Sequence, residues 1–366
     1  MPDARMAEGT RLITAAEAIL EATDLCLAAD PRVYLMGEGV ADPKGIFGTT
    51  SGLVARWGGD RIVEMPVAEN GLTGIAIGSA LRGRRPVMVH QRVDFALLAL
   101  EQLLNNAAKT FYVTNGHHTV PLVVRLIIGR GWGQGPEHSQ ALEPLFAHVP
   151  GLKVVLPSTP YEAKGMLISA IEDDNPIIIL EHRWIHYATG HVPAGHYTVP
   201  LSGPRRLVEG QDVTIVASSY MTLEALEAVA AMKEVGVGVD LFDLRVLQPL
   251  DLEPIVESVK RTGRLIIVDT GFKLYGIGAE IAAAVTERCF ASLKAAPRRL
   301  GLPNYPTPSS RGMIGDYYPG SPEVIAVASQ LIPEAAERLA GASERVKSHR
   351  TAVPVDIPHP AFKGPF

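Results

Sequence analysis

The sequence predicts an α/β protein built from two domains, each with a parallel sheet. Short apolar runs rich in β-branched residues recur along the chain, separated by segments with helical spacing, as is typical of parallel strands joined by helices. The alternation stops around residues 191–206, where Pro, Gly, His and Ser indicate a linker. At 366 residues, 47% of them hydrophobic, the chain can bury two cores. We therefore expect a first domain over residues 11–190, a second over 207–342 and an extended tail over 343–366.

The first domain is expected to alternate strands with helices. The predicted strands cover residues 33–36, 62–64, 87–90, 121–128 and 177–180. The predicted helices cover residues 14–28, 71–81, 96–109 and 160–172. The last helix has the clearest local signals, because Thr159 can act as its N-cap, Pro160 fits the first helical position and Glu162 completes a capping box.

The second domain repeats the pattern. Its predicted strands cover residues 213–216, 239–244 and 265–269, and its predicted helices cover residues 222–235, 252–260, 278–290 and 322–339. The following segment carries four prolines and little periodicity, which favours an extended arm or a disordered tail.

Charge and composition exclude several classes of protein. A net charge of −5 provides no basic field for nucleic acid or an anionic membrane. Cys26 and Cys289 lie in Ala- and Leu-rich contexts far apart, so we expect buried apolar residues rather than a disulfide. We find no secretory signal and no uncharged apolar run of the roughly 20 residues that a membrane helix needs. The expected location is therefore the cytoplasm.

Four chemically capable residues each follow a different predicted strand. They are Glu38, Glu69, Phe95 and His138. Ligands of open parallel sheets bind beyond the carboxyl ends of the strands, so these side chains are expected to converge on one site.

Two of these residues have a structural alternative. Glu69 precedes an apolar helix, where it could serve as a proton-sharing carboxyl group or simply cap the helix. His138 ends a glycine-rich loop formed by Gly129, Gly131, Gly133 and Gly135, whose backbone could approach a ligand closely. Histidine is suited to proton transfer near neutral pH, but it could also be held by a backbone carbonyl group.

Other motifs carry less weight. The glycine-rich loop and residues 271–278 both fail the G-x-G-x-x-G spacing of a dinucleotide site. Four histidines at positions 182, 186, 191 and 196 lack the carboxylate or cysteine company of a metal centre. No G-x-S-x-G segment supports a hydrolase.

Several segments together resemble the beta subunits of the decarboxylating component of 2-oxo acid dehydrogenases, within the transketolase-like thiamine diphosphate enzymes. The matching segments occur in the same order as in the family and fall within residues 11–335. They cover residues 37–38, 59–63, 66–69, 94–95, 106–109, 138–140, 146–155, 157–160, 243–245, 247–251 and 278–280. The resemblance implies a thiamine-diphosphate pyrimidine-binding domain followed by a transketolase C-terminal-like domain.

The resemblance also implies roles for individual residues. Glu69 would hydrogen-bond a ring nitrogen of the cofactor's aminopyrimidine and favour the imino tautomer, which removes the thiazolium proton. Phe95 would stack on the aminopyrimidine, and Gln91 would lie beside it as a further cofactor contact. His138 would transfer protons near the reacting carbon and contact the substrate. Glu38 would relay protons behind the activating glutamate.

A partner subunit is implied by an absence. Relatives hold Mg²⁺ and the diphosphate with a Gly-Asp-Gly segment and a later asparagine, and no Gly-Asp-Gly occurs in this sequence. We therefore expect an alpha-type subunit to hold both, in an α2β2 heterotetramer with the cofactor at a subunit interface. The resemblance further implies a site for a monovalent cation such as K⁺. Its ligands would be the carbonyl groups of Leu122, Ala170 and Ile171, together with Asp173 and Asn175.

Departures from the family pattern leave the substrate open. Residues 90–93 (HQRV) replace a more apolar stretch, and residues 181–186 (EHRWIH) are also unusual. Arg92 could bind a carboxylate or phosphate of the substrate, or pair with the partner subunit. The leading interpretation is decarboxylation of a 2-oxo acid with acyl transfer to the lipoyl group of an acyltransferase. The alternatives are a split transketolase-like enzyme acting on ketol or acyl units of a ketose-like substrate, and a non-catalytic scaffold subunit.

Overall fold

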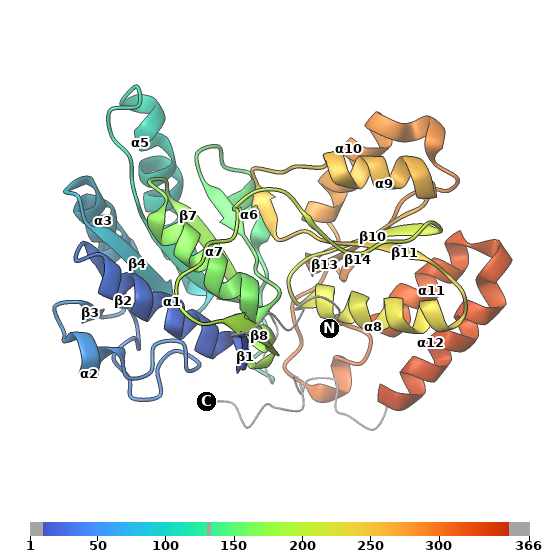
Figure 1. Cartoon of the computed structure of the whole chain (residues 1–366), viewed down its shortest axis with the longest axis horizontal. Coiled ribbons are helices and arrows are strands. Elements are labelled where there is room, and N and C mark those ends of the chain that lie inside the picture. The colour runs from blue at the N-terminus through green and yellow to red at the C-terminus, as the bar shows by residue number, and fades with distance from the viewer. Residues whose placement is uncertain (1–9, 130–132, 351–366) are drawn as a thin grey trace.

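The computed structural model describes residues 10–129 and 133–350, which form two α/β units side by side (Figure 1). The strands are β1 (Thr10–Thr14), β2 (Val33–Gly37), β3 (Ile62–Glu64), β4 (Arg85–His90), β5 (Val123–Ile128), β6 (Lys153–Val155), β7 (Ile177–His182), β8 (Thr189–Pro193), β9 (Arg205–Val208), β10 (Val213–Ala217), β11 (Val239–Asp243), β12 (Val246–Gln248), β13 (Leu265–Phe272) and β14 (Arg298–Leu302). The α-helices are α1 (Ala15–Ala29), α2 (Leu53–Trp57), α3 (Glu69–Leu81), α4 (Val93–Ala96), α5 (Ala108–Val113), α6 (Glu143–Ala147), α7 (Pro160–Glu172), α8 (Tyr220–Glu234), α9 (Glu253–Thr262), α10 (Ile277–Cys289), α11 (Ser321–Leu331) and α12 (Ala336–Arg350).

The first unit is built on a seven-stranded sheet in the order β12-β6-β7-β5-β4-β2-β3. All neighbouring strands from β6 to β3 in this order are parallel, so their carboxyl ends share one edge. Alternate residues of β2 enter different cores, since Val33 and Leu35 pack with α1 and α7 while Tyr34 and Met36 pack with α3. Helices therefore cover both faces of this sheet.

The second unit is built on a five-stranded sheet in the order β14-β13-β10-β11-β9, in which only β9 is antiparallel to its neighbour. One strand joins the two units, because β12 follows the second unit's β11 in the chain but pairs antiparallel with β6 of the first sheet. The predicted α/β class with two mainly parallel sheets is confirmed.

Several elements differ from the sequence expectations. Strands β1, β6, β8, β9, β12 and β14 were not expected, and the expected linker begins within β8 and ends within β9. The expected helix over residues 96–109 consists instead of α4, the 3₁₀ turn η1 (Leu97–Ala99), the π-helical segment η2 (Gln102–Ala107) and α5. Helix α7 has the expected bounds, and the hydroxyl group of Thr159 accepts a hydrogen bond from the backbone N–H of Glu162 at 3.2 Å.

The expected tail is partly helical, which corrects that prediction for residues 343–350. These residues continue α12, and α12 packs on α11 and α8. Ser343 donates a hydrogen bond to the carbonyl group of Pro322 at 2.9 Å, and Arg350 pairs with Glu224 at 2.7 Å. Residues 351–366 lie outside the described part of the chain.

Cys26 and Cys289 are buried free thiols, as expected. Among the residues described, no helix combines the length and apolar character needed to cross a membrane.

Candidate active site

The carboxyl-end edge of the first sheet holds all four residues expected to form a site. Glu38 follows β2 directly, and Glu69 is the first residue of α3, which follows β3. Phe95 lies in α4 after β4, and His138 lies in the loop after β5. Because these strands are adjacent and parallel, side chains from distant parts of the sequence meet at this edge.

The two glutamates form an acidic pair at one end of the site. Glu69 is buried, with 4% of its surface exposed. Ala68 occupies the N-cap position, so Glu69 is the first residue of the helix rather than its cap. Burial raises the pKa of Glu38, and the nearby charges of Glu69 and Glu64 raise it further. Such an environment favours the protonated form of Glu38.

The backbone around Glu38 is held by neighbouring side chains. The amide nitrogen of Gln91 donates to the carbonyl oxygen of Glu38 at 3.0 Å. Glu64 accepts hydrogen bonds from the backbone N–H groups of Gly39 at 2.6 Å and Ala41 at 2.8 Å. Within the described part of the chain, the buried Oε1 atom of Glu38 has no hydrogen-bond partner. This atom is therefore available to a ligand or a proton donor.

Phe95 and His138 are in contact. Their ring centroids lie 5.2 Å apart, with the rings nearly perpendicular at 86°. The loop that carries His138 is tied to α4 through Gln140, which donates to Asp94 at 2.7 Å. Burial raises the pKa of Asp94, although this hydrogen bond and the charges of Arg92 and His138 oppose the shift. The aromatic ring and the histidine thus form one side of the site.

Arg92 lies in a cluster with three residues that were not expected at the site from the sequence: Gln134, Arg183 and Phe47. Its Nη2 group donates to Oε1 of Gln134 at 2.6 Å, and Nη1 of Arg183 donates to the same oxygen at 2.6 Å. Both guanidinium groups also approach the ring of Phe47, at 5.5 Å for Arg92 and 4.5 Å for Arg183. Arg183 begins the 3₁₀ turn η3 (Arg183–Tyr187) after β7, at the same edge of the sheet.

A buried ion pair lies within the sheet and connects, through His186, to the ring of Phe47. Arg125 on β5 donates from Nε to Glu181 on β7 at 2.5 Å and from Nη2 at 2.9 Å. His186 contacts the same carboxylate at 3.0 Å and stacks on Phe47 with 5.7 Å between ring centroids. Burial opposes ionisation of Glu181, but the charge and hydrogen bonds of Arg125, with His186, lower its pKa to about 2.

The candidate monovalent-cation ligands lie at the opposite, amino-end edge of the sheet. The carbonyl groups of Ile171 and Asp173 each accept a hydrogen bond from Arg85 at 3.0 Å, and Leu122 accepts one from Ile177 at 2.9 Å. The Asp173 carboxylate also pairs with Lys153. Three of the five proposed ligands, Leu122, Ile171 and Asp173, therefore already have partners within this chain.

Sequence reasoning found the residues that follow predicted strands but missed Phe47, Gln134 and Arg183. Arg183 offered a usable signal, because it is the third residue after the strand predicted over residues 177–180 and lies within the unusual segment 181–186. Phe47 lies in a loop with no such signal.

Comparisons with known proteins agree over most of the chain. Residues 11–185 match the transketolase pyrimidine-binding domain, and residues 204–325 match the transketolase C-terminal domain. The chain is 39% identical to the acetoin:2,6-dichlorophenolindophenol oxidoreductase subunit beta of Cupriavidus necator, covering 85% of this chain and 95% of that protein. It is 35% identical to the 2-oxoisovalerate dehydrogenase subunit beta of Bacillus subtilis, covering 83% and 94%. It is 40% identical to the pyruvate dehydrogenase E1 component subunit beta of Porphyra purpurea, covering 80% and 88%.

A solved structure of a split-gene transketolase, described as an inactive beta4 tetramer, has the same fold. The TM-score is 0.70 at 21% identity, covering 88% of this chain and 98% of that one. At this identity the similarity shows the fold alone.

Proposed function

Because the chain belongs to the family of beta subunits of thiamine-diphosphate-dependent 2-oxo acid dehydrogenases, we propose that it forms an enzyme of this type with an alpha-type subunit. The reaction is the decarboxylation of a 2-oxo acid, with transfer of the acyl group to the lipoyl group of an acyltransferase. The observation that carries this proposal is the pairing of the buried Glu69 with the partly buried Glu38 on the same sheet edge as the Phe95–His138 contact.

The residues at this edge fit the pyrimidine half of the cofactor. They supply a buried carboxyl group, an aromatic ring and a histidine, and the orphaned Oε1 atom of Glu38 is an acceptor in need of a partner. When bound, thiamine diphosphate supplies a nucleophilic carbon and accepts the electron pair released by decarboxylation.

Each residue of this chain has a separate task in the proposed mechanism. Glu69 holds a proton at a ring nitrogen of the pyrimidine, and Glu38 exchanges that proton with it. Phe95 orients the pyrimidine by stacking, and Gln91 fixes the backbone of Glu38. His138 gives or takes a proton at the substrate's oxygen.

The diphosphate and Mg²⁺ are assigned to the alpha-type subunit, because this sequence has no Gly-Asp-Gly segment.

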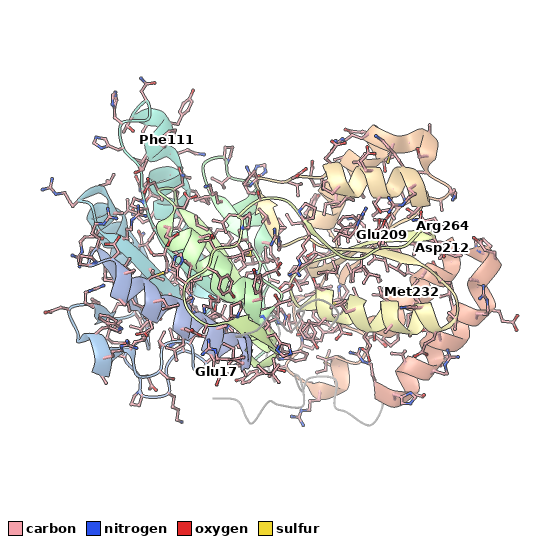
Figure 2. The ribbon with its side chains drawn as sticks, viewed as in Figure 1. Glu17, Phe111, Glu209, Asp212, Met232 and Arg264 are labelled. Carbon is pink, nitrogen blue, oxygen red and sulfur yellow. The ribbon has the colours of Figure 1, made fainter. Side chains whose placement is uncertain are left out.

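Exposed apolar side chains fit the proposed α2β2 assembly. Phe111, Tyr112 and Val113 at the end of α5 are 52%, 86% and 73% exposed, and Tyr275 is 86% exposed. Figure 2 shows Phe111 on α5, at the outer end of the first unit. Clustered exposed apolar groups of this kind are typical of protein interfaces. A K⁺ ion at the amino-end edge remains a prediction from the resemblance.

The test is activity of the two-subunit complex. The chain is co-expressed with an alpha-type subunit, supplied with thiamine diphosphate and Mg²⁺, and assayed on a panel of 2-oxo acids with an artificial electron acceptor. Glu69→Gln should reduce turnover by at least roughly 100-fold, the range expected for loss of an acid–base group. Glu257→Gln, on the exposed face of α9, is the matched control and should retain full activity. Size-exclusion chromatography should show that both variants assemble. Near-normal turnover of Glu69→Gln would refute the assigned role.

Acetoin is a second candidate substrate, because the beta subunits of two acetoin oxidoreductases, at 39% and 36% identity, are among the relatives. The same assay with acetoin and with ketoses separates the proposed reaction from acetoin cleavage and from ketol transfer. A complex that binds the cofactor but converts no member of the panel would favour the scaffold alternative.

A further inference from the structure

Two arginines at the active-site edge converge on a single neutral oxygen atom. Arg92 follows β4 and Arg183 follows β7, with 5% and 0% of their surfaces exposed. Each donates to Oε1 of Gln134 at 2.6 Å. The strand between them in the sheet is β5, and the loop after β5 carries Gln134. The convergence therefore follows directly from the strand order.

These guanidinium groups remain positively charged at neutral pH. Burial lowers the pKa of Arg183 to about 9, with a contribution from the charge of Arg92. Burial lowers the pKa of Arg92 to about 10, and the charge of Asp94 opposes this shift. Two positive charges thus point at an amide oxygen that carries only a partial negative charge. Desolvated like charges repel, so this arrangement is stable only where other contacts impose it.

Arg92 retains hydrogen-bonding capacity. Its Nη1 atom is buried and has no acceptor among the described residues. Phe47 lies against both guanidinium groups, and His186, bonded to Glu181, stacks on that ring. The donors are therefore held in place by a buried network of contacts within this chain.

We propose that Arg92 and Arg183 together bind an anionic group of the substrate, a carboxylate or phosphate remote from the reacting carbonyl group, which replaces the oxygen of Gln134. Planar guanidinium groups bind such oxyanions through paired N–H donors. The proposal rests on the proposed function and adds a substrate class to it. Substrates that carry an anionic group remote from the reacting carbonyl group, either 2-oxo dicarboxylic acids or phosphorylated ketoses, would be preferred over analogues that lack this group.

The place of this pair along the chain fits substrate recognition. Arg92 stands between Gln91 and Phe95, and Gln134 precedes His138 in the same loop. A group bound by the arginines would therefore lie beside the Phe95–His138 side of the site. A salt bridge to the partner subunit fits less well, because both arginines are already buried within this chain.

The first experiment measures anion binding without catalysis. The thermal unfolding midpoint of the two-subunit complex is followed with increasing inorganic phosphate or glutarate, at constant ionic strength set with NaCl. Ligands that bind the folded state alone raise this midpoint. We expect one of the two anions to raise it in the wild type. Arg92→Gln and Arg183→Gln should abolish the shift, whereas Arg288→Gln, in an exposed pair on α10, should keep it. Arg92→Lys, which keeps the charge but loses the planar fork, should show a reduced shift.

The second experiment uses matched substrates. 2-Oxoglutarate is compared with 2-oxovalerate, and fructose 6-phosphate with fructose. In one pair, the member that carries the remote anionic group should have a kcat/KM higher by roughly 10- to 100-fold, as expected for hydrogen bonds to a charged group. Arg92→Gln should remove that preference mainly through KM. The preferred pair distinguishes a carboxylate from a phosphate.

The outcomes separate the two proposals. A complex that is inactive on every substrate but shows an arginine-dependent anion shift would refute the proposed function and support this inference. An active complex without anionic preference, whose anion shift is absent or unchanged in both arginine variants, would overturn the inference alone. If Arg92→Gln leaves KM unchanged but abolishes association of the two subunits, the inference is also overturned. Arg92 would then contact the partner subunit instead of the substrate.

Discussion

The interior of the first sheet and its carboxyl-end edge both keep arginines away from water, but their partners differ. In the interior, Arg125 is fully buried and forms two hydrogen bonds with the carboxylate of Glu181. At the edge, Arg92 and Arg183 share the neutral oxygen of Gln134. The interior arginine is neutralised by a carboxylate on the neighbouring strand, whereas the two edge arginines bring two positive charges to one neutral oxygen. Like charges held close together away from water repel each other, so their convergence at this edge is consistent with the anion-binding role proposed above.

The buried acids show the same contrast. The pKa of Glu181 falls to about 2, because Arg125 and His186 outweigh the effect of burial. Glu143, at the start of α6, lies fully buried beside another acid, and burial together with the charge of Asp269 raises its pKa to about 8. One carboxyl group therefore stabilises the fold when it is ionised, and the other destabilises it.

The largest effect is expected from breaking the interior pair. Glu181→Gln leaves Arg125 buried without a counter-charge, which should lower the free energy of unfolding by about 3–5 kcal/mol. The folded-state pKa of Glu181 lies below its ordinary value of 4.5, so its stabilising effect is complete above pH 4.5 and is lost as the pH falls towards 2. The difference between wild type and variant, measured by urea unfolding, should shrink over that range. The double variant Arg125→Met/Glu181→Met should recover much of the loss. A double variant as unstable as Glu181→Gln would contradict the explanation.

The second-largest effect is expected from Glu143→Gln, which should raise the free energy of unfolding instead of lowering it. The folded-state pKa of about 8 lies above the ordinary value of 4.5, so the acid destabilises the fold increasingly as the pH rises from 4.5 to 8. Glutamine can still accept the hydrogen bond that Thr270 donates at 2.8 Å. We expect the variant to be more stable than the wild type by on the order of 2 kcal/mol above pH 8, with the gain vanishing near pH 4.5. Thermal unfolding across this range provides the measurement. A pH-independent difference would show that Glu143 does not titrate between these values.

Much of the fold and part of the site could be predicted from the sequence for one physical reason. A buried parallel strand is a short apolar run, and whatever follows it lies at the same edge of the sheet as the residues after its neighbours. Glu38, Glu69 and His138 satisfy this rule without any knowledge of strand order. The three-residue strands β6 and β12 were not predicted although the equally short β3 was, because a run of three residues carries too little periodicity to be recognised reliably.

The pairing of buried charges could not be predicted, because it depends on strand order. Arg125 and Glu181 are 56 residues apart and meet only because β5 and β7 are neighbours in the sheet. The same adjacency brings Arg183 to Gln134. From the sequence alone, Arg92 was equally compatible with a substrate contact and a subunit contact. Its burial and its shared acceptor now favour the first.

A smaller effect is expected when one charge of the edge pair is removed. In Arg92→Met the like charge next to Arg183 disappears, together with an N–H group that has no acceptor in the described part of the chain. The free energy of unfolding of the ligand-free chain should stay constant or rise by about 1 kcal/mol. Arg125→Met, the same substitution in the interior, should destabilise the chain because it leaves Glu181 without its counter-charge. Urea unfolding of the two variants side by side tests the contrast, and equal destabilisation would remove the distinction between the two regions.

The smallest effect should come from an arginine that water already solvates. The side chains of Arg288 and Glu253 are 41% and 60% exposed, and they form an ion pair at the surface of the second unit. Exposed pairs contribute about 0–1 kcal/mol, because solvent screens the charges and two long side chains must be ordered. Arg288→Gln should therefore change the free energy of unfolding by less than about 0.5 kcal/mol. If raising the salt concentration alters the stability of wild type and variant equally, the pair contributes nothing measurable. A loss comparable to that of Glu181→Gln would mean that burial does not decide how much a charge pair stabilises this protein.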